Sequence, residues 1–195
     1  MCKKFVLFFL LICSVCFSFS QKVSVNAFIE NKIANKGNDT IYYDIHRPLK
    51  WEDFKGTPDY HFFGGAVTAS GFAFDAAISM VNDLMTLKIG IYTFFSKNGS
   101  WKKPDINSDY HLLHEQNHFN ITRIGASQFL KKISEAKFTR SNYQQVMTSI
   151  FDSVYKENMA LQKQYDNATE HSINQQQQLL WNDKIGAELN KVITH

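Results

Sequence analysis

The sequence predicts an α+β domain, because strand patterns occupy its first half and helix patterns its second. Three early segments are rich in β-branched and aromatic residues or alternate small with large side chains, namely 40–45, 66–77 and 84–95. Later in the chain, apolar residues recur at helical spacing in the segments 111–133, 141–165 and 171–192. We therefore expect strands up to Ser96 and three helices after it.

The segment 84–95 (LMTLKIGIYTFF) is the strongest strand candidate. Residues 81–83 (Val-Asn-Asp) precede it and predict a hairpin connection, since Asn and Asp favour turns. Residues 107–109 (Asn-Ser-Asp) stand before the first helical pattern and are N-cap candidates. Four glutamines at 175–178 fall within the last helical pattern, where they predict a solvated helix face.

The first 20 residues have the three parts of a secretory signal peptide. Lys3 and Lys4 form a positively charged start, residues 5–16 are almost entirely apolar, and Ser18 and Ser20 supply the small residues of a cleavage site. We expect residues 1–20 to be removed and the chain to be exported, to the periplasm or to the medium. The alternatives are a retained signal anchor and lipid attachment at a cysteine, but the Leu-small-small sequence expected before a lipidated cysteine is missing.

Composition narrows the classes of partner. Loss of the two early lysines with the signal peptide lowers the formal net charge from +3 to +1, and no basic stripe remains, so a nucleic-acid partner is not expected. No later segment approaches the roughly 20 apolar residues of a membrane span, so none is expected after signal cleavage. All 3 cysteines lie in the signal peptide. We expect the chain that remains after signal cleavage to consist of an N-terminal extension with the first strand, residues 21–45, and one domain, residues 46–195. The sequence does not specify its oligomeric state.

The segment His114-Glu115-Gln116-Asn117-His118 matches the H-E-x-x-H pattern. Residues four apart lie on one face of a helix, so the two imidazoles can converge on one zinc ion. The glutamate beside the first histidine is then placed to act as general base towards an attacking water. Gly125, seven residues after His118, lies on the same face, where we expect a larger side chain to crowd the site.

A catalytic zinc takes three protein ligands and leaves one position open, so the pattern requires a third ligand. The side chains that qualify are His46, His61, His111, Asp166, Glu170, His171 and His195. We favour His171, because it stands in a polar break between two helical patterns, at the expected start of the last helix. Asp166 is the alternative.

Short segments along residues 46–185 follow a family pattern in order: 51–56 (WEDFKG), 66–71 (AVTASG), Ser100-Trp101, 113–119 (LHEQNHF), 165–171 (YDNATEH) and Trp181. With these segments the sequence resembles the bacterial secreted, predicted zinc-dependent proteases, a family assigned to the zincin (peptidase MA) superfamily.

The resemblance implies a zincin-like fold, with a small twisted, mostly antiparallel sheet, the motif helix beneath it and the third ligand on a later helix. It also supports His171 as that ligand. Two positions depart from the family pattern, which often has Asp where this chain has Asn120 and commonly has Gly where it has Ser172. We expect the first departure to weaken a hydrogen bond that orients a ligand imidazole, and neither removes a ligand or the base.

Further residues are candidates for supporting roles. Hydrogen bonds that orient the zinc ligands, or the alternative ligand itself, could come from Asp166, Thr169 and Glu170. Two of these residues, Asp166 and Thr169, are equally candidates for capping the last helix. Tyr110 and Tyr165 are candidate donors to the oxyanion that develops during hydrolysis.

Together these features predict an exported zinc metallopeptidase that holds one Zn²⁺ per chain and cleaves a peptide or protein substrate. We expect the strand at 84–95 to lie along the cleft and to bind the substrate backbone by strand addition. One alternative is a zinc hydrolase of a cell-envelope amide. The other is a non-catalytic binding protein stabilised by zinc, for which four protein ligands would be typical.

Overall fold

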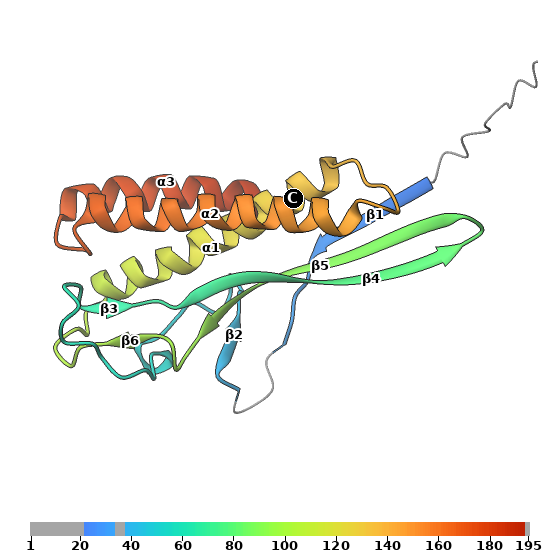
Figure 1. Ribbon diagram of the computed structural model, residues 1–195. Coiled ribbons are helices and arrows are strands. Elements are labelled where there is room, and N and C mark those ends of the chain that lie inside the picture. The colour runs from blue at the N-terminus through green and yellow to red at the C-terminus, as the bar shows by residue number, and fades with distance from the viewer. Residues whose placement is uncertain (1–21, 34–37, 194–195) are drawn as a thin grey trace, which may run out of the picture.

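A computed structural model describes residues 22–33 and 38–193, so the predicted signal peptide and His195 lie outside the described residues. The fold is α+β, as predicted, with a sheet and three helices on one face of it (Figure 1). The helices are α1 (Asp109–Glu135), α2 (Tyr143–Thr169) and α3 (Gln175–Ile193). Among the described residues, no helix is long and apolar enough to cross a membrane.

The main sheet is built around β5 (Leu84–Ser96), whose two edges are both paired. On one edge β4 (Ser70–Val81) runs antiparallel along almost the whole strand. On the other edge β1 (Lys22–Ile29) pairs in parallel near the start of β5, and β2 (Thr40–Tyr42) pairs antiparallel near its end. The sheet is therefore mixed, and the sequence analysis missed β1, which alternates exposed and half-buried residues.

Two short features complete the strand layer. Asn82 and Asp83 connect β4 to β5 with φ of 45° and 62°, the left-handed conformations of a tight hairpin turn, which confirms the predicted connection. A separate pair of strands, β3 (Ala66–Val67) and β6 (Trp101–Lys102), lies beside the start of α1 (Figure 1). A 3₁₀ helix spans Trp51–Asp53.

The core lies between β5 and the helices because alternate side chains of β5 point to that face. Leu87, Ile89 and Ile91 are fully buried there. They pack in one cluster with Phe129 and Ile133 of α1, so this helix is held directly on the sheet. A second cluster joins α1 to α2 and α3.

Helix ends decide where the site residues lie. Ser108 caps α1, its Oγ accepting from the backbone N–H of His111 at 3.2 Å, as the sequence predicts. The helix α2 continues to Thr169, beyond the expected end at 165, and α3 begins at Gln175 rather than at His171. The turn between them holds Glu170, His171 and Ser172 at φ of 51°, 51° and 73°. Three successive non-glycine residues in the left-handed region are uncommon, so this turn is strained.

Candidate metal centre

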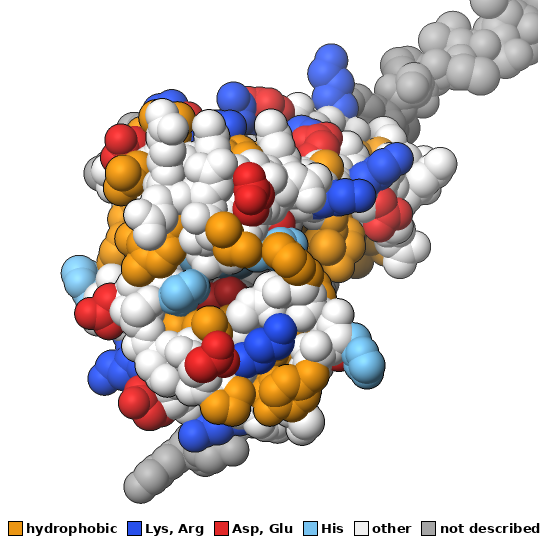
Figure 2. Space-filling model, turned by 90° about the vertical axis from the view of Figure 1, so that its left-hand side faces the viewer, with side chains coloured by type: hydrophobic (Ala, Val, Ile, Leu, Met, Phe, Trp, Pro, Cys, Tyr) orange, Lys and Arg blue, Asp and Glu red, His pale blue; other side chains and the backbone are white. Residues whose placement is uncertain are grey.

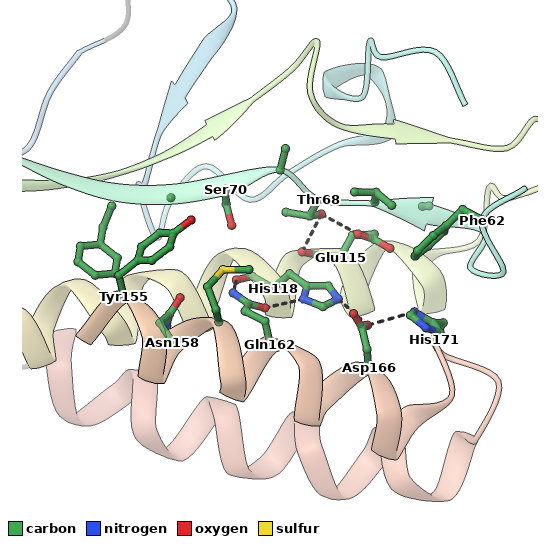
Figure 3. Close-up of a pocket in the computed structure, with 16 residues that line it drawn as sticks. Phe62, Thr68, Ser70, Glu115, His118, Tyr155, Asn158, Gln162, Asp166 and His171 are labelled. Atoms are coloured by element: carbon green, nitrogen blue, oxygen red, sulfur yellow. Dashed lines mark hydrogen bonds and ion pairs between the residues drawn. The ribbon is translucent and has the colours of Figure 1, made fainter. Parts of the chain in front are cut away.

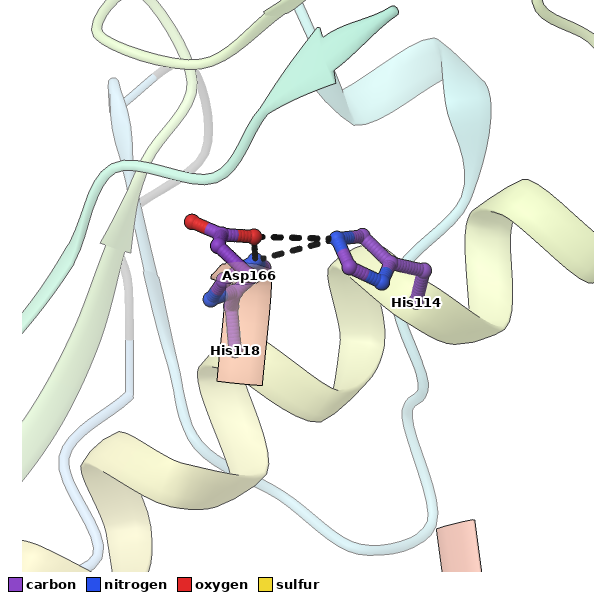
Figure 4. A group of neighbouring side chains, drawn as sticks. All are labelled: His114, His118 and Asp166. Carbon is purple, nitrogen blue, oxygen red and sulfur yellow. Dashed lines mark hydrogen bonds and ion pairs between the residues drawn. The ribbon is translucent and has the colours of Figure 1, made fainter. Parts of the chain in front are cut away.

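Three potential ligand atoms meet between α1 and α2: Nε2 of His114, Nε2 of His118 and Oδ1 of Asp166 (Figure 4). The two Nε2 atoms are 3.3 Å apart. Asp166 Oδ1 lies 3.0 Å from His118 Nε2 and 3.3 Å from His114 Nε2. The i, i+4 spacing on α1 brings the imidazoles to one face, and Asp166 reaches them from the last turn of α2.

The Gln162 side chain fixes the orientation of the His118 ring. Its Nε2 donates to the His118 carbonyl at 2.9 Å and to Thr122 Oγ1 at 3.1 Å, which leaves Oε1 facing the ring. Oε1 accepts from His118 Nδ1 at 2.6 Å, so this hydrogen-bond network places a proton on Nδ1 and turns Nε2 towards His114 and Asp166.

A second glutamine, Gln178 of α3, does the same for His114. It is fully buried, and its Nε2 donates to the Tyr165 hydroxyl at 2.6 Å and to Asn182 Oδ1 at 2.8 Å. Its Oε1 lies 2.8 Å from His114 Nδ1 and accepts the proton there. A hydrogen bond on the far ring nitrogen is the arrangement that orients histidines towards a metal.

The result is a site that favours positive charge. The two Nε2 atoms and a carboxylate oxygen face one another, and they repel unless a cation or a proton lies among them. Burial opposes a charge on His118, but the hydrogen bond and charge of Asp166 outweigh it and raise the pKa of His118 to about 9. Burial also opposes the charge of Asp166, but its bonds with His114 and His118 hold the pKa of that carboxyl well below its usual range.

Glu115 lies beside these groups at the floor of a cleft of about 350 Å³ (Figure 3). It is only 4% exposed, and its Oε2 accepts from the Thr68 hydroxyl at 2.7 Å. Thr68 belongs to the segment 66–72, which forms one wall of the cleft, while α2 forms much of the other. In Figure 2 this end of the molecule is hollowed between the helical and the strand layers, with acidic and histidine side chains in the hollow.

The cleft wall corrects one expectation. The strand at 84–95 does not lie along the cleft, because β5 is the central strand and both of its edges are already paired. The segment 66–72 takes that place, and the outer edge of β4 continues from it.

His171 lies next to the group but outside the close set of three. Its Nδ1 is 3.4 Å from Asp166 Oδ1, and its ring packs edge-on against Phe62 (Figure 3). Phe63 makes a second edge-on contact with this ring. The side chain is 26% exposed and lines the cleft. The three donor atoms that come together thus belong to His114, His118 and Asp166, and Asp166 is the alternative third ligand named from the sequence. The favoured assignment of His171 as third ligand stays a prediction.

The remaining candidates have other contacts. The Tyr165 ring stacks on His114 with centroids 4.7 Å apart, and its buried hydroxyl is held by Gln178, so it is not among the described residues that line the cleft. The Tyr110 hydroxyl donates to the Ser172 carbonyl at 2.7 Å and ties the strained turn to α1. Thr169 Oγ1 donates back to the Tyr165 carbonyl at 2.8 Å.

Further along, exposed Glu170 accepts from Asn174 Nδ2 at 3.4 Å. Nδ1 of His111 lies 2.6 Å from the Ser108 hydroxyl. His46 and His61 are exposed. None of these four is in the group of three described donor atoms.

The structure also describes three neighbouring positions that the sequence singles out. Asn120 does not contact an imidazole in the described network; its Oδ1 accepts from the Tyr43 hydroxyl at 3.0 Å and from Gln116 Nε2 at 2.9 Å. Ser172 sits at a φ of 73°, a conformation that glycine adopts more readily than serine. A Cβ at Gly125 would lie 2.5 Å from Nδ2 of Asn158, a residue of α2 that lines the cleft.

Sequence reasoning missed Gln162, Gln178 and Thr68. Gln162 stands four residues before Asp166 on α2, a helical spacing that a longer predicted helix would have revealed. Gln178 was expected on a solvated face, but it is the one fully buried member of its glutamine run. No local signal marks Thr68.

The comparison with known families bears on this segment. Residues 101–172 match a family described as "Bacterial protein of unknown function (DUF922)". The matched DUF922 segment runs from β6 to Ser172, so it includes both motif histidines, Glu115, Gln162, Asp166 and His171, but not Thr68 or Gln178. No curated protein and no solved structure matches the chain.

Proposed function

We propose that this chain is an exported zinc metallopeptidase of zincin type. The observation that carries the proposal is the convergence of two Nε2 atoms and one carboxylate oxygen beside a buried glutamate in a cleft. Two imidazoles and a carboxylate are a ligand set of catalytic zinc sites, so the residues present fit the metal. His114, His118 and Asp166 would hold it, with His171 as the rival third ligand.

When bound, zinc lowers the pKa of water to about 7 and polarises a carbonyl, which makes hydrolysis possible at neutral pH. Glu115 would take a proton from the attacking water and return it to the leaving amine. The Thr68 hydroxyl, 2.7 Å from Glu115 Oε2, holds that carboxylate in one orientation and leaves its other oxygen free to accept a proton.

The cleft wall supports a peptide as substrate. Among the described residues β4 pairs only with β5, and Ser70 and Gly71 of β4 line the cleft, so a free strand edge is available there. An extended peptide can hydrogen-bond to such an edge, with its side chains alternating between the wall and the opening. The same edge would accept the peptide part of a cell-envelope cross-bridge, so the two substrates share this feature.

One observation favours the non-catalytic alternative. His171 Nδ1 is only 3.4 Å from Asp166 Oδ1, so a small movement of the turn would add a fourth ligand and close the site. A closed four-ligand shell is typical of structural zinc.

The deciding experiment measures zinc content and hydrolysis of the mature chain beside three variants. We expect about one zinc per chain in the parent, in Glu115→Gln and in His171→Ala, and a large loss in Asp166→Asn. Glu115→Gln should abolish cleavage of casein and of mixed peptides while the metal stays bound. Loss of zinc in His171→Ala with retention in Asp166→Asn would exchange the two ligand assignments. A zinc-free parent after metal supply, or full turnover in Glu115→Gln, would refute the proposed enzyme.

A further inference from the structure

A second cavity, of about 1140 Å³, shares no residue with the cleft. Its walls are the end of β1 and the residues after it, the segment 43–46, one face of α1 and the last turn of α3. A volume of this order suffices for a small organic ligand. The metal chemistry proposed above uses no residue of this cavity.

The main polar group in its wall is Arg123 of α1, which is 9% exposed. Its guanidinium donates to Ser127 Oγ and, at 3.5 Å, to the Val192 carbonyl. Within the part of the chain that the structure describes, no carboxylate pairs with it, although the group has five N–H donors and stays charged. A buried charge without a counter-ion is costly, so an anion is the expected neighbour.

The other charged side chains around the cavity do not supply a counter-ion for Arg123. Three lysines also line the cavity: Lys32 pairs with Asp75, Lys191 pairs with Glu188, and Lys131 is exposed. Glu30 lies 3.9 Å from Lys32, and Asp44 Oδ1 accepts from the backbone N–H of His46, so the two acidic residues of the wall have partners of their own.

A second unpaired group lies in the same wall. Thr93 of β5 is 4% exposed, and its Oγ1 has no hydrogen-bond partner among the described residues. Around these two polar groups the lining is mixed, and its apolar part includes Ala27, Ile29, Leu130, Val192 and Ile193. The wall thus presents a buried anion donor, Arg123, next to apolar side chains.

From this combination we propose that the cavity binds an organic carboxylate with an apolar body, its carboxylate held by Arg123. The planar guanidinium matches a carboxylate through two parallel hydrogen bonds. The apolar walls accommodate the rest of the ligand. A fatty acid and the C-terminal residue of a peptide both have this chemistry.

Titration calorimetry of the mature chain tests the proposal with two matched pairs of probes. The pairs are decanoate with decanamide, and N-acetyl-leucine with its amide. We expect at least one acid to bind and its amide to bind much more weakly, because only the acid pairs with the guanidinium. Decanoate alone would identify a fatty acid as ligand, and N-acetyl-leucine alone a peptide C-terminus. No binding of either acid, or equal binding of acid and amide, would overturn the proposal.

Substitutions at Arg123 test whether the acid binds to its guanidinium. Arg123→Met should weaken binding of the acid about 30-fold or more, since it removes one partner of a buried charge pair. Arg123→Lys keeps the charge but loses the planar fork, so we expect an intermediate loss. Lys137→Met, an exposed change outside the cavity wall, is the control and should bind like the parent. Unchanged binding in Arg123→Met would refute the assignment, and if that variant does not fold, the comparison of acid with amide in the parent still decides.

Discussion

Replacing Gln162 by leucine tests whether the two imidazoles are held for a metal. In the parent, His118 Nδ1 donates its proton to Gln162 Oε1, and the two heavy atoms are 2.6 Å apart. Leucine has a similar volume but cannot accept that proton. Without that acceptor, the ring is free to turn and to place its proton on Nε2, the atom that faces His114 and Asp166. Metal binding must then restore the ring orientation and remove the proton.

The magnitude follows from these contacts. Loss of a hydrogen bond behind a metal ligand typically lowers metal affinity 10- to 100-fold. Each factor of ten corresponds to about 1.4 kcal/mol, so we expect a loss of about 1.4–2.8 kcal/mol of zinc-binding free energy. The variant also loses the bonds from Gln162 Nε2 to the His118 carbonyl and to Thr122, which should lower the free energy of unfolding of the metal-free protein by about 1–2 kcal/mol.

Zinc affinity is measured by competition with a chelator of known affinity, under conditions where parent and variant are both folded. Gln164→Leu on the exposed side of the same helix makes the same chemical change away from the site and should bind zinc like the parent. If Gln162→Leu binds zinc as tightly as Gln164→Leu, then the glutamine does not orient His118 for a metal, and the reasoning from the ring protons fails.

The other predictions concern stability and use chemical denaturation. Gly125→Ala should lower the free energy of unfolding by about 1–3 kcal/mol, because the new Cβ would lie 2.5 Å from Asn158 Nδ2, whereas Gly186→Ala in α3, with nothing within 4 Å, should raise it by up to about 1 kcal/mol. Similar effects of both alanines would contradict the close approach of α1 and α2. Burial opposes the charge of Asp53, but its two bonds from Arg47 outweigh this and lower the pKa of Asp53 below its usual 3.8. This contribution is present above about pH 3.8 and is lost as the pH falls through the lower folded value, so Asp53→Asn should cost about 1–3 kcal/mol at pH 7 and less in acid. An equal cost at both pH values would show that the carboxylate charge is not involved.

The order of the elements could be predicted from the sequence, because local signals carry it. The apolar spacing of α1, the serine at its N-cap and the Asn-Asp turn before β5 act within a few residues of themselves. Strand pairing does not depend on such local signals. The partner of β5 at its second edge is β1, which lies some 60 residues earlier in the chain. The sequence therefore predicts β5 as a strand without showing that it is central.

The proposed third ligand, Asp166, shows the same limit at the scale of one helical turn. The expected end of α2 at 165 excludes Asp166 from the helix, but the structure continues the helix to Thr169. That extension puts Asp166 on the face already occupied by Gln162, four residues earlier, and directs its carboxylate to both imidazoles. His171 then falls in the left-handed turn rather than at a helix start.

The site also depends on helices that the motif does not contain. His114 and His118 come from α1, Gln162 and Asp166 from α2, and the partner of His114 Nδ1 from α3 through Gln178. Helix α1 carries both rings, and α2 and α3 each supply a hydrogen bond that orients one of them. The three helices must therefore be packed before the site exists. A metal that binds only this packed arrangement stabilises it by mass action. Zinc should therefore protect α3 against unfolding as well as α1, although no atom of α3 is expected to touch the ion.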